Sequence, residues 1–324
     1  MRYAAININF DSLGAAYGFP PNYRDKSFTD VGERFLNLSR KYGFKYSIYV
    51  IGKDLEKSEN REIVKEWSLQ GHEIGNHSWS HPYDLGSMKY DEVRKEVELS
   101  HELISKTTGV EPKGFIAPNW STSKELINVL IDLNYTYDTS SFPSPLMYLS
   151  LMKMLWNHRK YKRTRIRQIL KRKDYLTFLR GFRRPYYTKG GIPKDIKAEN
   201  GGLLILPLPV NRYRIPCWHT LGFVLRWKLQ NLILRSCLSE LDAFYYLVHP
   251  ADLITSHDID DKRDLHWERV RGSLEDKLSY LKGVLSVIIG SGRKIITMKE
   301  LANKIQNTDL NKSQQSGENE NNIY

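Results

Sequence analysis

Cysteine is scarce in this chain, which contains only Cys217 and Cys237. Two cysteines without CxxC spacing exclude the disulfide framework of a small secreted domain, a zinc knuckle and a thiol redox pair. Long apolar runs are also missing, since no stretch reaches the roughly 18 residues that a membrane-spanning helix needs. The first residues lack the basic and apolar regions of a signal peptide. We therefore expect a cytoplasmic protein whose two thiols lie in its core.

Acidic residues are absent between Asp138 and Asp174. Lys and Arg crowd residues 153–173 instead, directly after an apolar run at 145–156. A solvated basic helix is the simplest interpretation. A nucleic-acid partner is not expected, because no reader motif accompanies the charge. Apolar residues followed by cations are typical of docking on an anionic membrane surface, so residues 145–173 predict a peripheral position at the inner membrane face.

Strand-like and helix-like segments alternate along most of the chain. In residues 3–11 every second side chain shares a face, so Asn9 and Asp11 point the same way at the end of a predicted strand. Alternating strands and helices with short connections imply parallel strands and right-handed crossovers, and hence an α/β barrel or a doubly wound sheet. The predicted strands cover residues 3–11, 45–52, 72–79, 112–118, 135–141, 203–210 and 244–250, and the predicted helices cover 28–42, 59–71, 91–109, 122–134 and 273–289. Residues 293–305 are expected to close the domain.

The segment "GHEIGNHSWSHP" contains two histidines four residues apart, His77 and His81. Two imidazoles at this spacing can converge on one side of a turn and present neutral nitrogens to a divalent metal ion. The spacing alone is a weak signal, because most histidines are solvated or make structural hydrogen bonds. His72, which precedes the pair, is interpreted as structural.

Several segments resemble, in order, the motifs of the polysaccharide deacetylase family (NodB-homology domain, carbohydrate esterase family 4). "GHEIGNHSWSH" resembles the histidine motif of that family, and the strand ending at Asp11 resembles its first motif. "GFIAPNW" (114–120) resembles the Arg-x-Pro motif, "YDTSSF" (137–142) the strand before the variable region, and "LVHP" (247–250) the last motif. The ordered set is far more specific than any one of its members.

The resemblance implies a distorted (β/α)7-type barrel as a single domain over residues 1–305. A basic helical insertion is expected at about 143–200, and a disordered polar tail at 306–324. The resemblance also implies a divalent metal cofactor, with Zn²⁺ the first expectation, held by one aspartate together with His77 and His81. Two imidazoles and one carboxylate leave open coordination positions for a substrate oxygen. His249 matches the histidine that protonates the leaving amine.

The first motif can be aligned in two registers. Many members of the family have two adjacent aspartates, the base and then the metal ligand, which would make Asp11 the base and put Ser12 in the place of the ligand. Other members have Asp-x-Asp, which puts Asn9 at the base position and makes Asp11 the ligand. We prefer the second register, because two histidines without a carboxylate make a poorer metal site and because Asn9 and Asp11 share a strand face.

The motif that usually carries an arginine has Ile116 in this chain. An arginine that holds an anionic base has no purpose beside a neutral amide, so Asn9 and Ile116 are consistent with each other. Hydrolysis then needs another base, or a water activated by the metal alone. The candidate bases follow His249 in the sequence and are Asp252, Asp258, Asp260 and Asp261.

Pro118, Asn119 and Trp120 are candidates for substrate binding, with Trp120 stacking on a sugar ring; the alternative is that they only shape the barrel mouth. The expected function is metal-dependent hydrolytic deacetylation of an N-acetylated sugar in a polysaccharide or a lipid-linked glycan. A second hypothesis is a deacetylase-like protein that has lost hydrolysis and binds a glycan or a partner. A third is a basic scaffold on a membrane surface or a nucleic acid.

Overall fold

A computed structural model describes residues 2–19, 23–158, 163–189, 202–259 and 270–308. Within these residues a curled nine-stranded sheet forms an open, distorted barrel with strand order β6-β7-β5-β4-β3-β2-β1-β8, and β9 also pairs with β1. The predicted barrel architecture is therefore confirmed. The strands are β1 (Tyr3–Phe10), β2 (Ser47–Val50), β3 (Glu73–Asn76), β4 (Gly114–Phe115), β5 (Tyr137–Asp138), β6 (Tyr186–Thr188), β7 (Leu203–Ile205), β8 (Ala243–Val248) and β9 (Lys294–Ile296).

The strand β1 has parallel partners on both of its edges. It pairs with β8 along one edge, while β9 and β2 share the other edge over its first and second halves. Ala4, Ile6, Ile8 and Phe10 belong to the apolar cluster that packs on the surrounding helices. Ala5 belongs to the cluster inside the barrel. The alternation predicted for residues 3–11 therefore turns every second residue of β1 toward the barrel interior.

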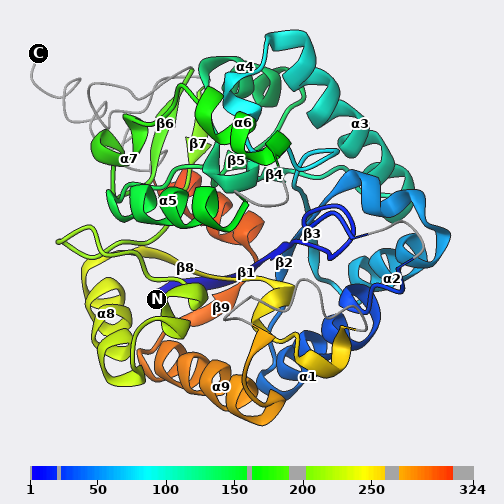
Figure 1. The fold of residues 1–324 in the computed structure, drawn as a ribbon. Coiled ribbons are helices and arrows are strands. Elements are labelled where there is room, and N and C mark those ends of the chain that lie inside the picture. Colours follow the sequence, from blue (N-terminus) through cyan, green and yellow to red (C-terminus); the bar gives the residue numbers. More distant parts are fainter. Residues whose placement is uncertain (1, 20–22, 159–162, 190–201, 260–269, 309–324) are drawn as a thin grey trace, which may run out of the picture.

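Helices cover the outer face of the sheet (Figure 1). Each buries one apolar stripe, as Val93, Val97 and Ile104 do in the helix at Tyr90–Thr108. That helix ends at Gly109, whose φ of 74° is accessible to glycine without steric cost. The helices are α1 (Gly32–Tyr42), α2 (Ser58–Leu69), α3 (Tyr90–Thr108), α4 (Lys124–Asp132), α5 (Leu146–His158), α6 (Arg163–Lys171), α7 (Thr177–Arg180), α8 (Trp227–Glu240) and α9 (Leu274–Gly290).

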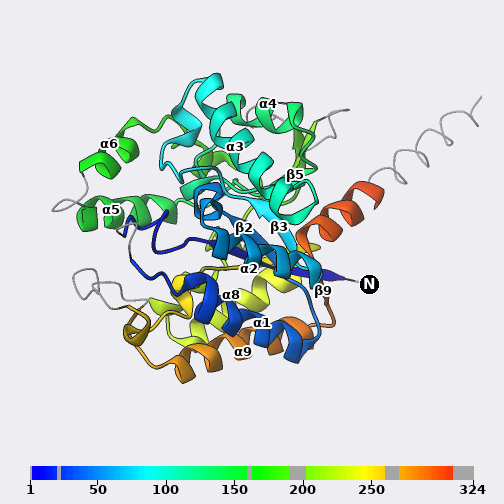
Figure 2. The same ribbon diagram turned by 90° about the vertical axis from the view of Figure 1, so that its right-hand side faces the viewer.

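The insertion predicted at 143–200 supplies α5, α6 and α7, but it is not purely helical. Its residues Tyr186–Thr188 form β6, which pairs antiparallel with β7 and makes the sheet mixed. Residues 190–201 lie outside the described residues. Figure 2 shows α5 and α6 on the left of the molecule, beyond the carboxyl end of β1, so the insertion lies on the side of the barrel where the parallel strands end.

Two further expectations need correction. The helix α8 was not predicted, because its apolar residues do not follow an uninterrupted helical stripe in a segment rich in Trp, Lys and Arg. Residues 306–308, predicted to begin a disordered tail, belong instead to a helix over residues 298–308. Residues 309–324 lie outside the described residues. Cys217 and Cys237 are fully buried free thiols, as expected.

Candidate metal centre

The first residue of the site, Asp11, lies just after the carboxyl end of β1. A tight turn follows the strand, in which the Asp11 amide donates to the Asn9 carbonyl at 2.8 Å. The next residue, Ser12, is buried, and its hydroxyl accepts a hydrogen bond from the Ala15 amide at 3.1 Å. The hydroxyl of Ser12 also bonds to the Asp54 side chain. This geometry favours the second register, with Asp11 and not Ser12 on the metal side.

The two histidines follow β3 in a loop with an uncommon backbone conformation. Ser78 and His81 have φ values of 64° and 56°, in the left-handed region that non-glycine residues rarely adopt. Side-chain hydrogen bonds hold the turn: the Ser78 amide donates to Asn76 Oδ1 at 2.8 Å, and the His81 amide donates to Ser78 Oγ at 3.2 Å. The turn brings the rings of His77 and His81 to a centroid distance of 4.9 Å. Strain of this kind persists where function requires a particular geometry.

Asp11, His77 and His81 converge on one point. Oδ1 of Asp11 lies 3.1 Å from Nε2 of His77 and 3.4 Å from Nε2 of His81. The three ligand atoms all lie within 4.8 Å of one another. Zinc binds nitrogen and oxygen at about 2.0–2.1 Å in a tetrahedron, so two of its ligand atoms lie roughly 3–3.5 Å apart. The two distances to Asp11 match this separation.

The protonation states of the three residues also fit a cation. Nδ1 of His77 donates to the Ile116 carbonyl at 2.7 Å, so a neutral His77 presents the lone pair of Nε2 to Asp11. Burial lowers the pKa of His81 to about 4. Burial alone would raise the pKa of Asp11, but His81 and His77 hold it well below its usual value. One carboxylate oxygen and two imidazole nitrogens at these distances are a ligand set that a divalent ion would bind together.

At the predicted base position, Asn9 is 4% exposed. Its Oδ1 has no hydrogen-bond partner in the part of the chain that the structure describes. Ile116 is fully buried in the apolar cluster inside the barrel. Since a primary amide does not take up a proton at neutral pH, the two positions form a neutral pair where a carboxylate and an arginine would form a charged one.

His249 directly follows β8, and the carboxylate of Asp252 lies next to it. The His249 amide donates to Asp252 Oδ2 at 2.8 Å, and the same oxygen lies 3.8 Å from His249 Nδ1. Because β8 pairs with β1 and Val248 lies opposite Ile8, His249 leaves its strand beside Asn9.

Asp258, another candidate base, is engaged elsewhere. Arg34 binds both of its carboxylate oxygens at 2.7 Å, and the Thr255 amide donates to one of them. Asp260 and Asp261 lie outside the described residues. Of the four predicted candidates, Asp252 is therefore the one that the structure brings next to His249.

Aromatic residues form one wall of the site. The centroid of the Trp120 ring lies 4.8 Å from that of Phe142 and 5.1 Å from that of Trp218. The ring centroids of Trp218 and His249 are 6.1 Å apart. Trp120 is 6% exposed, so it offers no open face for a sugar ring in this conformation. Together with the buried Pro118 it shapes the barrel mouth, which was the alternative interpretation. Trp218 lies outside every motif in the sequence and was missed.

Two arginines of the insertion hold the loops of this site. Arg165 donates to the His81 carbonyl at 2.9 Å and to the Ala16 carbonyl at 3.3 Å, and its guanidinium lies 4.2 Å from the centroid of the Tyr83 ring. Arg172 donates to the carbonyls of Asn119 and Trp120. Each arginine thus binds a carbonyl of a left-handed residue, since Asn119 and Trp120 have φ values of 50° and 53°.

The sequence alone predicts that all cations of the basic segment belong to one exposed surface. These two arginines show that some of its cations face the protein interior instead. Arg172 is 4% exposed and forms a bidentate ion pair with the buried Asp174. The sequence shows the charge of the segment but not which cations face inward, because that depends on how each helix is rotated against the barrel.

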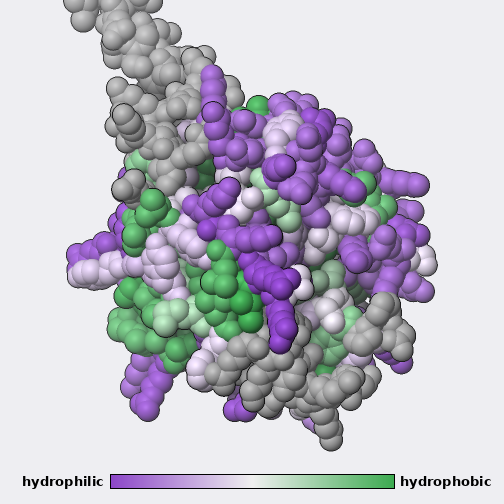
Figure 3. Space-filling view, turned by 45° about the horizontal axis from the view of Figure 1, so that its top comes forward, coloured by the Kyte–Doolittle hydropathy of each residue, from purple (hydrophilic) through white to green (hydrophobic). Residues whose placement is uncertain are grey.

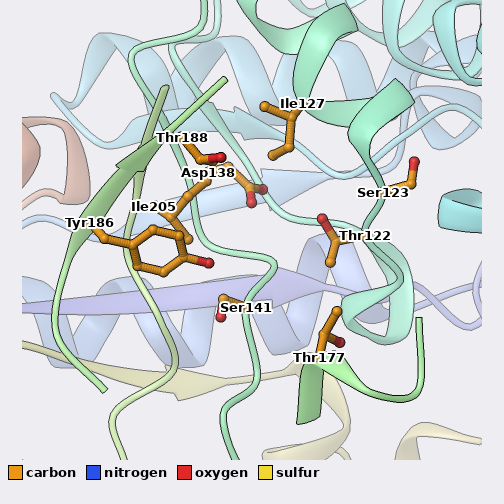
Figure 4. Close-up of a pocket in the computed structure, with 9 residues that line it drawn as sticks. All are labelled: Thr122, Ser123, Ile127, Asp138, Ser141, Thr177, Tyr186, Thr188 and Ile205. Atoms are coloured by element: carbon orange, nitrogen blue, oxygen red, sulfur yellow. The ribbon is translucent and has the colours of Figure 1, made fainter. Parts of the chain in front are cut away.

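A cavity of about 60 Å³ lies apart from the triad. The side chains of Asp138, Thr122 and Tyr186 point toward it (Figure 4). Asp138 accepts a hydrogen bond from Ser140, whose oxygen in turn accepts the Ala117 amide at 2.7 Å. Burial raises the pKa of Asp138 to about 7. The cavity is lined by none of the triad residues, so its carboxylate belongs to the support of β4 and β5 and not to the metal centre.

Part of this chain is similar to known proteins. The model of the polysaccharide deacetylase family matches residues 6–137. The peptidoglycan-N-acetylglucosamine deacetylase of Bacillus cereus is 34% identical over 85 residues, which cover 26% of this chain and 30% of that protein. The peptidoglycan deacetylase of Helicobacter pylori is 31% identical over 108 residues, which cover 33% of this chain and 36% of that protein. The matched segments span only about a third of the length of these relatives.

A solved structure supports the fold over a larger part of the chain. The structure described as a polysaccharide deacetylase from Mycobacterium smegmatis has a TM-score of 0.58 at 14% sequence identity, covering 94% of this chain and 90% of that one. This likeness shows that the two chains share the barrel fold.

Proposed function

We propose that this chain is a metal-dependent hydrolase that removes the acetyl group from an N-acetylated sugar. The match of residues 6–137 to the model of the polysaccharide deacetylase family supports this proposal. The substrate class is a polysaccharide such as peptidoglycan, or a glycan precursor on a lipid carrier. The convergence of Asp11, His77 and His81 on one point carries this proposal. The names of the peptidoglycan deacetylases that match part of the chain support the substrate class.

Asp11, His77 and His81 would hold the divalent ion, with Zn²⁺ the first candidate from its preference for nitrogen ligands in a tetrahedral site. When bound, such an ion supplies Lewis-acid chemistry toward the acetyl carbonyl and a water molecule. The hydrogen bond from His77 Nδ1 to the Ile116 carbonyl orients the ring and leaves Nε2 as the atom that would bind the ion.

The proton transfers fall to His249. With Asn9 at the base position, His249 takes the proton of the attacking water as its oxygen adds to the acetyl carbon. His249 then gives this proton to the sugar nitrogen as the C–N bond breaks, which releases acetate and the free amine. Asp252 supports both steps, because its carboxylate next to Nδ1 stabilises the protonated imidazole.

The second candidate is a deacetylase-like protein that binds a glycan without hydrolysing it. The neutral pair Asn9 and Ile116 favours it, because the barrel retains the metal-binding residues without the carboxylate and arginine of the family pattern.

Acetate release from N-acetylglucosamine oligomers and peptidoglycan fragments distinguishes the two candidates. The proteins to compare are the wild type, Asn9→Asp and His249→Ala, each supplied with Zn²⁺. The proposed function predicts acetate release by the wild type, faster release by Asn9→Asp, and a loss of about 10²–10⁴-fold in His249→Ala. If Asn9→Asp released acetate and the wild type did not, the native protein would not be a hydrolase, and the second candidate would be favoured.

A further inference from the structure

The helix α5 is apolar on two faces. One face packs into the core through Met147 and Leu151, which are 1% and 4% exposed. The other face carries Leu149, Met152 and Trp156, which are 61%, 65% and 65% exposed. These three residues follow each other at intervals of three and four, so they form one stripe along the outside of the helix. A surface helix of a globular protein normally has polar residues there.

The neighbouring helix α6 presents an exposed cationic face. Arg163, Arg167 and Lys171 are exposed at intervals of four residues, and Leu170 on the same side is 66% exposed. Within the described ranges, none of these three cations has a carboxylate within ion-pair distance. The inward side of α6 carries the buried Ile169 and the partly buried Arg165. The two helices pack against each other, so the apolar stripe and the cationic face are neighbours.

This surface lies on the side of the barrel that holds the metal centre. Arg165 connects α6 directly to the carbonyl of His81. Figure 2 shows α5 and α6 beyond the carboxyl end of β1, the strand that leads to Asp11. In the space-filling view, hydrophobic residues gather next to hydrophilic ones on the left of the molecule (Figure 3). None of the described helices is long and apolar enough to span a bilayer.

We propose that the outer faces of α5 and α6 dock on an anionic lipid bilayer, with Leu149, Met152 and Trp156 in the headgroup region and Arg163, Arg167 and Lys171 on lipid phosphates. An apolar stripe beside a cationic face is what an interfacial helix needs, and tryptophan is enriched at this depth. Each cation near the surface adds attraction that salt screens.

Two other occupants fit the surface less well. A second copy of the chain would bring the same cationic face against itself in a two-fold contact, which is repulsive for a chain with net charge +12. A nucleic acid would use the cations but leave the apolar stripe exposed to water. A bilayer uses both.

Docking in this orientation turns the mouth of the barrel toward the membrane. If the proposed hydrolysis holds, the substrate reaches the metal centre while still attached to its lipid carrier. The docking itself does not rest on hydrolysis, because lipid binding is measured without turnover.

Vesicle flotation of the full chain tests the proposal. The wild type is mixed with vesicles of phosphatidylcholine alone, or of equal parts phosphatidylcholine and phosphatidylglycerol. We expect flotation with the anionic vesicles only, weakening as salt rises. The triple variant Arg163→Gln, Arg167→Gln, Lys171→Gln should bind on the order of 100-fold more weakly, since each cation contributes roughly fivefold. The triple variant Leu149→Gln, Met152→Gln, Trp156→Gln should lose flotation as well.

The control variant Lys41→Gln, Lys65→Gln, Lys106→Gln removes equal charge from α1, α2 and α3, on the other side of the molecule, and should float like the wild type at matched ionic strength. Circular dichroism and thermal unfolding verify that each variant is folded. Equal binding to both vesicle types, or unchanged flotation of the α6 variant, would overturn the proposal. The proposal would also be overturned if the wild type did not float but formed an oligomer that the α5 variant cannot form. Binding of the wild type to single-stranded RNA but not to vesicles would overturn it as well.

Discussion

Asp138 shows how strongly burial acts on a single residue of this barrel. It is 1% exposed, with its carboxyl group between β5 and α4, and its pKa is raised to about 7. In the unfolded chain the pKa of an aspartate is about 3.9. The folded protein therefore holds a proton on Asp138 that the unfolded chain releases. The stability from this proton is complete below about pH 4 and is lost as the pH rises through about 7.

Asp138→Asn removes this pH dependence, because an amide keeps the shape of the protonated acid and can still accept from Ser140. The quantity to compare is the free energy of unfolding of the variant minus that of the wild type. This difference should be larger at about pH 8 than at about pH 5, by on the order of 2–3 kcal/mol. Urea unfolding at both pH values measures the difference, with the exposed Asp242→Asn as the control. An equal effect at both pH values would show that Asp138 is already ionised in the folded protein.

Individual site residues differ in how far the sequence predicts them. The alternation along residues 3–11 predicts that Asn9 and Asp11 share a face. In the structure the alternation runs along β1, and Asp11 lies just beyond its last residue, Phe10. Trp218 could not be predicted, because its position next to His249 arises from packing between segments far apart in the sequence.

Among the elements, the insertion connects the surface of the protein to its metal centre. The helix α6 carries Arg167 and Lys171 outward and Arg165 inward to the carbonyl of His81. The sequence alone shows only a run of cations. The burial of Ile169 fixes which face of α6 packs on the barrel. Arg165 lies four residues earlier on the same face of the helix, so it also faces the barrel.

Arg165→Met should weaken the affinity for the metal by about 10–100-fold, because the His81 loop loses a partner that holds its left-handed backbone. Competition with a chelator measures the affinity. Arg167→Met, on the outward side of the same helix, is the matched control and should keep the affinity of the wild type. Equal affinities of the two variants would show that the His81 loop holds its conformation without α6.

At the scale of the whole molecule, the alternation of strands and helices predicts the parallel barrel. The order β5-β4-β3-β2-β1-β8 consists of parallel pairs, as that pattern requires. The edge strand β6 was missed because three residues, Tyr186–Thr188, are too few to show alternation, and its antiparallel direction depends on the return path of the insertion. The single domain over residues 1–305 and the cytoplasmic location stay predictions.

The metal centre is the central claim, and metal content after purification tests it most directly. The wild type and two variants, His77→Ala and the exposed-histidine control His257→Ala, are supplied with Zn²⁺, desalted and measured by mass spectrometry for bound metal. We predict stoichiometric metal in the wild type and in His257→Ala, and loss of most of it in His77→Ala with the fold retained by circular dichroism. Full occupancy in His77→Ala, or a wild type that binds no divalent metal, would contradict the assignment of Asp11, His77 and His81 as its ligands.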